Sequence, residues 1–168
     1  MSIFSRRLGY VPRGERRGIR LEDTEPWRIT PTQDVSRFIR ALPLLVPEDS
    51  IAYFEDTGES HVAEYLGRVS IHAPGTKIAV GAIWPRPDRY HVPLTVNTME
   101  APATFLDDRP AGLFCSHCHV YREGTVVLQW HEAFSDDPLY VSRAVDEAMV
   151  RRFAEALGST LSSGRCAG

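Results

Sequence analysis

The densest group of chemically reactive side chains in this 168-residue chain is the segment Cys115-Ser116-His117-Cys118-His119. Thiolates and imidazoles are preferred ligands of zinc and other divalent transition metals. The same letters match the C-x-x-C-H pattern of covalent haem attachment and the C-x-x-C of thioredoxin-like redox pairs. Both of those chemistries place the cysteines on a turn or at the start of a helix, whereas the flanking residues here are typical of a strand. A metal site is therefore the sharper hypothesis.

The alternation of a β-strand predicts which of these side chains share a face. Cys115, His117, His119 and Tyr121 should point one way, and Ser116, Cys118 and Val120 the other way. Residues 113–121 and 126–134 flank a turn signal and are predicted to form a β-hairpin. With a two-residue Glu123-Gly124 turn, Arg122 lies opposite Thr125. The same register sets Cys115 opposite Glu132, His117 opposite Trp130, and His119 opposite Leu128.

An H-x-H pair on a strand, with Cα atoms about 7 Å apart, can hold a divalent ion such as zinc if a third ligand is supplied. The preferred version uses His117 and His119 with a carboxylate from elsewhere, and Cys115 and Glu132 are the further candidates on the hairpin. Cys115 and His119 lie about 13 Å apart along a straight strand, too far to share one ion. The structural alternative stays open: the histidines pack against Trp130, and the free cysteines act as small apolar residues.

Other catalytic patterns are incomplete. His131-Glu132 begins like H-E-x-x-H, but Ser135 stands where the second histidine belongs. The chain has no G-x-S-x-G elbow, no G-x-x-x-x-G-K phosphate loop and no G-x-G-x-x-G motif. Whether the protein is an enzyme stays open on this basis, and a non-enzymatic role is slightly favoured.

A proline-stiffened segment carries residue types that are enriched in binding hot spots. It contains Trp84, Arg86, Arg89, Tyr90 and His91. Because stiff segments lose little conformational entropy on docking, the segment predicts a protein-binding module, of adaptor or toxin-neutralising type. The alternative is that Trp84 ends a core strand and Tyr90 packs over it.

Hydrophobic periodicity predicts the elements that must position these residues. One helix starts from the capping residues Thr30 and Gln33 and stops before Pro43. Further helices are predicted around 62–69, around 98–106, and from the cap Ser142 to a stop at Gly158. Strands are predicted at 51–54 and 78–84, with a short edge strand around 90–94. Strand, helix and strand over 51–84 make a candidate βαβ unit, so the expected fold is a single α+β domain: a mixed β-sheet with a βαβ unit and a C-terminal β-hairpin, with helices packed on the sheet.

Composition divides the chain into three parts. The sequence is 43% hydrophobic and 24% charged, typical of one globular domain. We expect a basic flexible arm at 1–21, the domain at 22–158 and a flexible tail at 159–168. Residues 1–20 hold six arginines and one glutamate (net +5), whereas the rest holds 13 basic and 21 acidic residues (net −8). Because residues 21–168 are acidic, we expect them to bind nucleic acid poorly. Only the basic arm could bind nucleic acid, and only weakly.

The sequence contains no apolar run long enough for a secretory signal or a membrane span. We therefore expect a cytoplasmic protein with reduced cysteines and no membrane partner. Lys77 is the only lysine among 19 basic residues, a coding bias that suggests a bacterial source.

Overall fold

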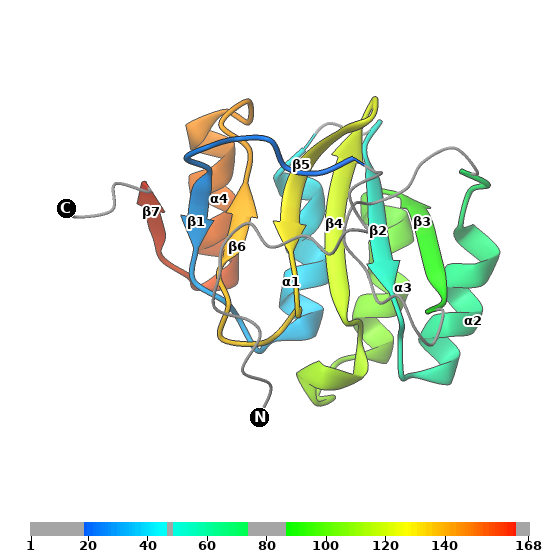
Figure 1. Cartoon of the computed structure of the whole chain (residues 1–168). Helices are drawn as coiled ribbons and strands as arrows, with labels where there is room; N and C mark the ends of the chain where they lie inside the picture. The colour runs from blue at the N-terminus through cyan, green and yellow to red at the C-terminus, as the bar shows by residue number, and fades with distance from the viewer. Residues whose placement is uncertain (1–18, 47–48, 74–86, 164–168) are drawn as a thin grey trace, which may run out of the picture.

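A computed structural model describes residues 19–46, 49–73 and 87–163 (Figure 1). These residues form seven β-strands and four α-helices. The strands are β1 (Trp27–Ile29), β2 (Ile51–Glu55), β3 (Arg89–Pro93), β4 (His117–Arg122), β5 (Thr125–Trp130), β6 (Leu139–Val141) and β7 (Leu161–Ser163). The α-helices are α1 (Val35–Ala41), α2 (Ser60–Val69), α3 (Val96–Phe105) and α4 (Glu147–Leu157), with short 3-10 helices at Leu42–Leu44 and Ala111–Leu113.

The strands form one sheet in the order β3-β2-β4-β5-β6-β1-β7, and every pairing in it is antiparallel. The expected single-domain α+β class is therefore confirmed, as is the edge position of the strand near residue 90. No parallel pairing occurs among the described strands, so the predicted mixed sheet is not observed there. The predicted strand 78–84, which would complete the βαβ unit, lies outside the described residues. None of the described helices is long and apolar enough to cross a membrane.

The helices lie along one face of the sheet, which we call the helix-covered face (Figure 1). Side chains that point to this face are mainly apolar and buried, among them Phe54, Val120, Leu128 and Trp130. They meet the predicted stripe of α1, in which Phe38 packs its ring 5.0 Å from that of Trp130. Burial of apolar surface between the two layers is the main stabilising term of such a fold. The opposite face, which no described helix covers, is the helix-free face.

Three helices do not start where the sequence predicts. The side chain of Asp34, and not that of Thr30, accepts from the N–H of Arg37 and starts α1. Thr95 and Thr98 form a reciprocal capping box for α3, so this helix begins before residue 98. Asp146, and not Ser142, caps α4. In each case several oxygen-bearing side chains precede the helix, and sequence does not decide which one reaches the free N–H groups. The predicted stop at Gly158, with φ 68°, is confirmed.

The β4–β5 hairpin has the predicted turn but not the predicted register beyond it. Arg122 pairs with Thr125 as expected, and Glu123 and Gly124 both have the positive φ of a tight hairpin turn. A bulge then adds Val127 to β5, so that His119 lies opposite Gln129 and Cys118 lies opposite Trp130. The predicted pairs His117–Trp130 and His119–Leu128 are therefore wrong by one residue. The predicted face of His117, His119 and Tyr121, opposite that of Cys118 and Val120, is confirmed.

Both ends of the described chain contact the sheet, one as an edge strand and the other by packing on a face. Residues Leu161–Ser163, expected in the flexible tail, form β7 and pair with β1. At the other end, Ile19 and Leu21 pack against Tyr53, Tyr121 and Val126 on the helix-free face. The N–H of Leu21 donates to Oε1 of Gln129 at 3.3 Å. The segment that follows residue 19 thus runs across the helix-free face before it enters β1 (Figure 1).

Candidate functional site

Antiparallel register places a row of polar and aromatic side chains across the helix-free face. His91, Tyr53, His119 and Gln129 lie side by side on β3, β2, β4 and β5. The ring of Tyr53 lies 5.1 Å from that of His91 and 5.8 Å from that of His119. Cross-strand neighbours on one face of a sheet are close enough to interact directly. The rings of His91, Tyr53 and His119 therefore form one continuous group, in which Tyr53 and His119 are buried.

A second row places three histidines together. Glu55 lies opposite Arg89 on one side and His117 on the other. Because of the bulge in β5, His131 comes beside His117, with ring centroids 5.6 Å apart. The His119 ring lies 4.9 Å from that of His131 and 6.5 Å from that of His117. We refer to His117, His119 and His131 as the histidine cluster.

The backbone next to the cluster is strained. Glu132 follows His131 directly and has φ 46°, and Phe134 has φ 65°. Asp56, which follows Glu55, has φ 60°. Left-handed backbone at non-glycine residues costs about 1–3 kcal/mol each and concentrates at functional sites. Buried packing of Phe134, whose ring lies 4.6 Å from that of Trp130, helps to hold the loop in this conformation.

His119 is fully buried, and neither of its ring nitrogens has a hydrogen-bond partner in the part of the chain that the structure describes. The buried Nδ1 of His131 is also without a partner there. Buried polar atoms are nearly always hydrogen-bonded, so three such nitrogens on two adjacent rings need an explanation. Packing alone does not provide this explanation, because a neutral imidazole carries an N–H and a lone pair that both need a hydrogen-bond partner.

Burial keeps the cluster neutral. Desolvation, with the neighbouring histidines as a smaller cause, lowers the pKa of His119 well below its ordinary value. Desolvation and the proximity of His117 lower the pKa of His131 to about 4. Burial also lowers the pKa of His117, although Glu55, Glu132 and Asp56 oppose the shift. At neutral pH all three imidazoles therefore offer lone pairs and N–H groups and carry no charge.

Several other polar groups of the helix-free face are paired. The Tyr53 hydroxyl donates to Oε2 of Glu55, which is fully buried and lies 3.9 Å from Nε of Arg89. Burial and this carboxylate raise the pKa of Tyr53, so the phenol remains a donor. The Tyr121 hydroxyl and Nδ1 of His91 are 2.9 Å apart. The N–H of Glu132 donates to Nδ1 of His117 at 3.2 Å. Both ring nitrogens of His119 and Nδ1 of His131 have no such partner among the described residues, and they are the unpartnered buried atoms that lie on adjacent rings.

No family model, curated protein or solved structure matches the chain. The function proposed for the protein depends on the site's own geometry and chemistry.

The four predicted metal residues are only partly brought together. His117 and His119 share the cluster, but Cys115 is buried in the core of the helix-covered face. Strand β4 begins only at His117, so alternation does not extend back to Cys115. Glu132 contributes its backbone N–H to His117 and leaves its side chain exposed. Among the described residues, no three His, Cys, Asp or Glu side chains are arranged to hold one metal ion.

The cysteines offer no alternative chemistry. Burial raises the pKa of Cys118 and, together with Cys118 and Glu55, that of Cys115. Reactive thiols are exposed and have a lowered pKa, whereas these two are buried and protonated. They serve as small apolar core residues.

The predicted partner-binding segment is only partly described, since Trp84 and Arg86 lie outside the described residues. Arg89 is exposed on the edge strand β3. Tyr90 is buried in the helix-covered core. His91 belongs to the row on the helix-free face. Protein binding through this segment stays a prediction.

Sequence reasoning missed three residues of the site: His131, Tyr53 and Glu55. His131 stands at the start of an incomplete H-E-x-x-H motif, which does not indicate its place beside His117 and His119. Tyr53 and Glu55 alternate with Ala52 and Phe54 along β2, so their shared face was available from periodicity. Their proximity to His117 and His119 depends on the β2–β4 pairing, which sequence alone does not give.

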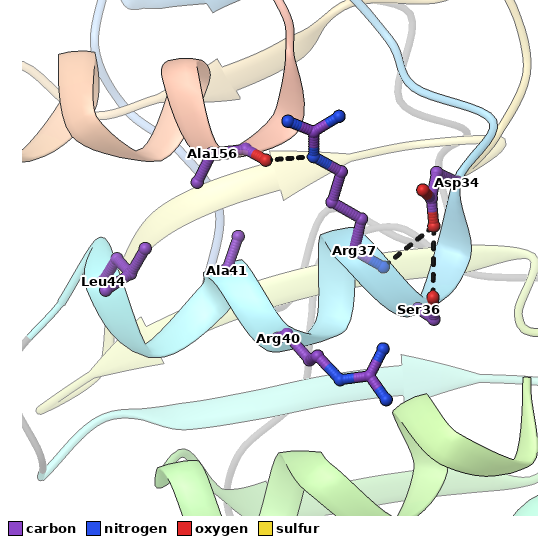
Figure 2. Close-up of a pocket in the computed structure, with 7 residues that line it drawn as sticks. All are labelled: Asp34, Ser36, Arg37, Arg40, Ala41, Leu44 and Ala156. Atoms are coloured by element: carbon purple, nitrogen blue, oxygen red, sulfur yellow. Dashed lines mark hydrogen bonds between the residues drawn. The ribbon is translucent and has the colours of Figure 1, made fainter. Parts of the chain in front are cut away.

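A pocket of about 370 Å³ lies between α1 and α4 on the other side of the molecule (Figure 2). Nε of Arg37 donates to the carbonyl of Ala156 near the end of α4. Arg40 forms ion pairs with Glu100 and Asp107 at 3.3 and 2.9 Å. Both guanidinium groups thus join helices to one another, and the pocket has a structural explanation.

Proposed function

We propose that the protein is a small-ligand-binding protein whose site is the histidine cluster on the helix-free face. The observation that supports this most directly is the state of His119. Its ring is fully buried, and both ring nitrogens lack partners among the described residues. A ligand that meets these nitrogens completes the arrangement.

His119 carries an energetic cost that an apolar residue at the same position would avoid. An unsatisfied buried donor or acceptor costs about 1–3 kcal/mol, whereas an apolar side chain of similar shape costs nothing of this kind. The adjacent strained residues Glu132 and Asp56 add a further cost. Groups that lower stability and gather in one place are typical of binding and catalytic sites. Selection for stability alone favours leucine at residue 119.

The cluster also limits the type of ligand. Neutral imidazoles in a low-dielectric setting bind electron-pair acceptors and hydrogen-bonding groups, and they offer no charge to an anion. We therefore expect a ligand that accepts an electron pair or forms hydrogen bonds, and not one that is recognised by its charge.

Substitution of His119 by leucine, which has a similar volume, tests the proposal without knowledge of the ligand. In the ligand-free protein we expect His119→Leu to raise the free energy of unfolding by about 1 kcal/mol, because two unsatisfied buried nitrogens are removed. Urea denaturation of the full chain, followed by tryptophan fluorescence, measures the change.

His91→Leu is the matched control on the same face. His91 is hydrogen-bonded to Tyr121 at 2.9 Å, so its loss should lower the free energy of unfolding by about 1 kcal/mol. Opposite signs for the two variants support a site at His119. A loss of stability in both variants would mean that His119 has a structural role, and would overturn the proposal.

A further inference from the structure

We propose that the ligand is a first-row transition-metal ion held by His119 and by Nδ1 of His131. This inference rests on the proposed binding function of the histidine cluster and names the ligand class. The two rings lie edge to face, one on β4 and the other just after β5, with an interplanar angle of 61°. Both present buried nitrogens without partners in the described part of the chain.

The separation of the two rings fits shared coordination. Metal–nitrogen bonds of about 2.0–2.1 Å in a tetrahedral arrangement place the centroids of two imidazoles about 5 Å apart. The centroids of His119 and His131 are 4.9 Å apart. The His117 ring lies 5.6 and 6.5 Å from the other two, and fits less well.

The hydrogen bonds of His117 explain why it is not a third ligand. Its Nδ1 accepts the backbone N–H of Glu132, so the lone pair is used and the ring proton resides on Nε2. A ring in this tautomer has no lone pair left for a metal. Two protein ligands agree with the absence of a three-ligand group among the described residues.

The donor set selects the ion. Cys115 and Cys118 lie in the helix-covered core, so the site offers nitrogen and no thiolate. Imidazole favours Cu²⁺, Ni²⁺ and Zn²⁺ over Mg²⁺ and Ca²⁺, and affinity generally peaks at Cu²⁺. With two protein ligands the ion would need water or a second small ligand to complete its coordination.

The full chain, stripped of metal with a chelator, should be titrated with Cu²⁺, Ni²⁺, Zn²⁺ and Mg²⁺ by calorimetry. We expect binding of about one Cu²⁺ per chain, weaker binding of Ni²⁺ and Zn²⁺, and none of Mg²⁺. Electron paramagnetic resonance of the copper form should show hyperfine coupling to two imidazole nitrogens. His119→Leu and His131→Leu should each weaken Cu²⁺ binding by more than about tenfold, since even groups behind the ligands change affinity by about 10–100-fold.

The double variant His61→Gln/His72→Gln, which removes two exposed histidines, should bind Cu²⁺ as the parent does. The inference is overturned if copper binds no more weakly to His119→Leu than to the parent, if the spectrum shows no imidazole nitrogen or three, or if no transition metal binds. The effect of His119→Leu on the free energy of unfolding distinguishes a failure of the metal proposal from a failure of the ligand-site proposal. If His119→Leu stabilises the chain and no metal binds, the metal is wrong and the ligand site stands. If His119→Leu destabilises the chain and no metal binds, both are wrong.

Discussion

The two faces of one sheet use the same strands for different purposes. On β2, Phe54 points to the helix-covered face and packs its ring 4.9 Å from that of Phe114, whereas Tyr53 points to the helix-free face and donates to Glu55. Both side chains are almost fully buried. The helix-covered face thus buries mainly apolar groups, and the helix-free face buries histidine, tyrosine and carboxylate.

The difference separates what the fold requires from what it tolerates. Apolar burial on the helix-covered face accounts for the packing of the helices on the sheet. The polar groups of the helix-free face bring desolvation costs that a sheet layered on helices does not need. Because such costs persist where a function requires them, the helix-free face is where the function is expected.

The largest expected effect comes from the helix-covered face. Phe54→Ala should lower the free energy of unfolding by about 3–5 kcal/mol, because it removes a fully buried ring and leaves a cavity. Urea denaturation gives the change directly. The exposed Arg68 on α2 provides the control, and Arg68→Ala should change stability by less than about 0.5 kcal/mol. A cost of only about 1 kcal/mol for Phe54→Ala would mean that the two faces do not differ as described.

Acid should destabilise the protein through the helix-free face. Histidines of the unfolded chain titrate near pH 6.5, whereas burial and His117 hold the pKa of His131 at about 4 in the fold. Between these values the unfolded chain binds a proton that the folded chain does not, so stability falls as the pH falls. His131 alone should contribute a loss of about 3 kcal/mol from pH 7 to pH 4, and His119 adds to it.

The His131→Leu variant isolates this contribution. Its free energy of unfolding should fall less steeply between pH 6.5 and pH 4 than that of the parent, while His61→Gln, on exposed α2, should follow the parent. Chemical denaturation at a series of pH values measures the curves. Parallel curves for the parent and His131→Leu would contradict a neutral, buried His131.

Much of the helix-covered face could be predicted from sequence, because it depends on local periodicity. The stripe Val35, Phe38, Ile39 and Leu42 is buried as expected. The shared face of His117, His119 and Tyr121 follows from strand alternation in the same way. Boundaries were less accurate, since several possible caps precede each helix and tertiary packing selects one.

The site itself depends on information that local patterns do not carry. The single extra residue Val127 shifts the register of β5 and brings His131, and not Trp130, beside His117. A one-residue shift in pairing exchanges the two faces of a strand. Glu55 reaches His117 only through the β2–β4 pairing of residues far apart in the chain. The histidines could therefore be picked out from sequence, but their partners could not.

The smallest expected changes in stability come from two hydrogen-bonded tyrosines on the helix-free face. Tyr53→Phe removes a donor to the buried carboxylate of Glu55 and should lower the free energy of unfolding by about 2 kcal/mol, the range of hydrogen bonds to charged groups. Tyr121→Phe removes the same atom but breaks a bond to the neutral ring of His91, and should cost about 1 kcal/mol. Urea denaturation of the two variants side by side gives the difference. Equal losses would mean that the hydrogen bond from Tyr53 to the Glu55 carboxylate stabilises the fold no more than the bond between Tyr121 and His91. A larger loss at Tyr53 would indicate that the paired polar groups of this face stabilise the fold. The nitrogens of His119 and His131 that have no partner among the described residues would then be the groups assigned to binding.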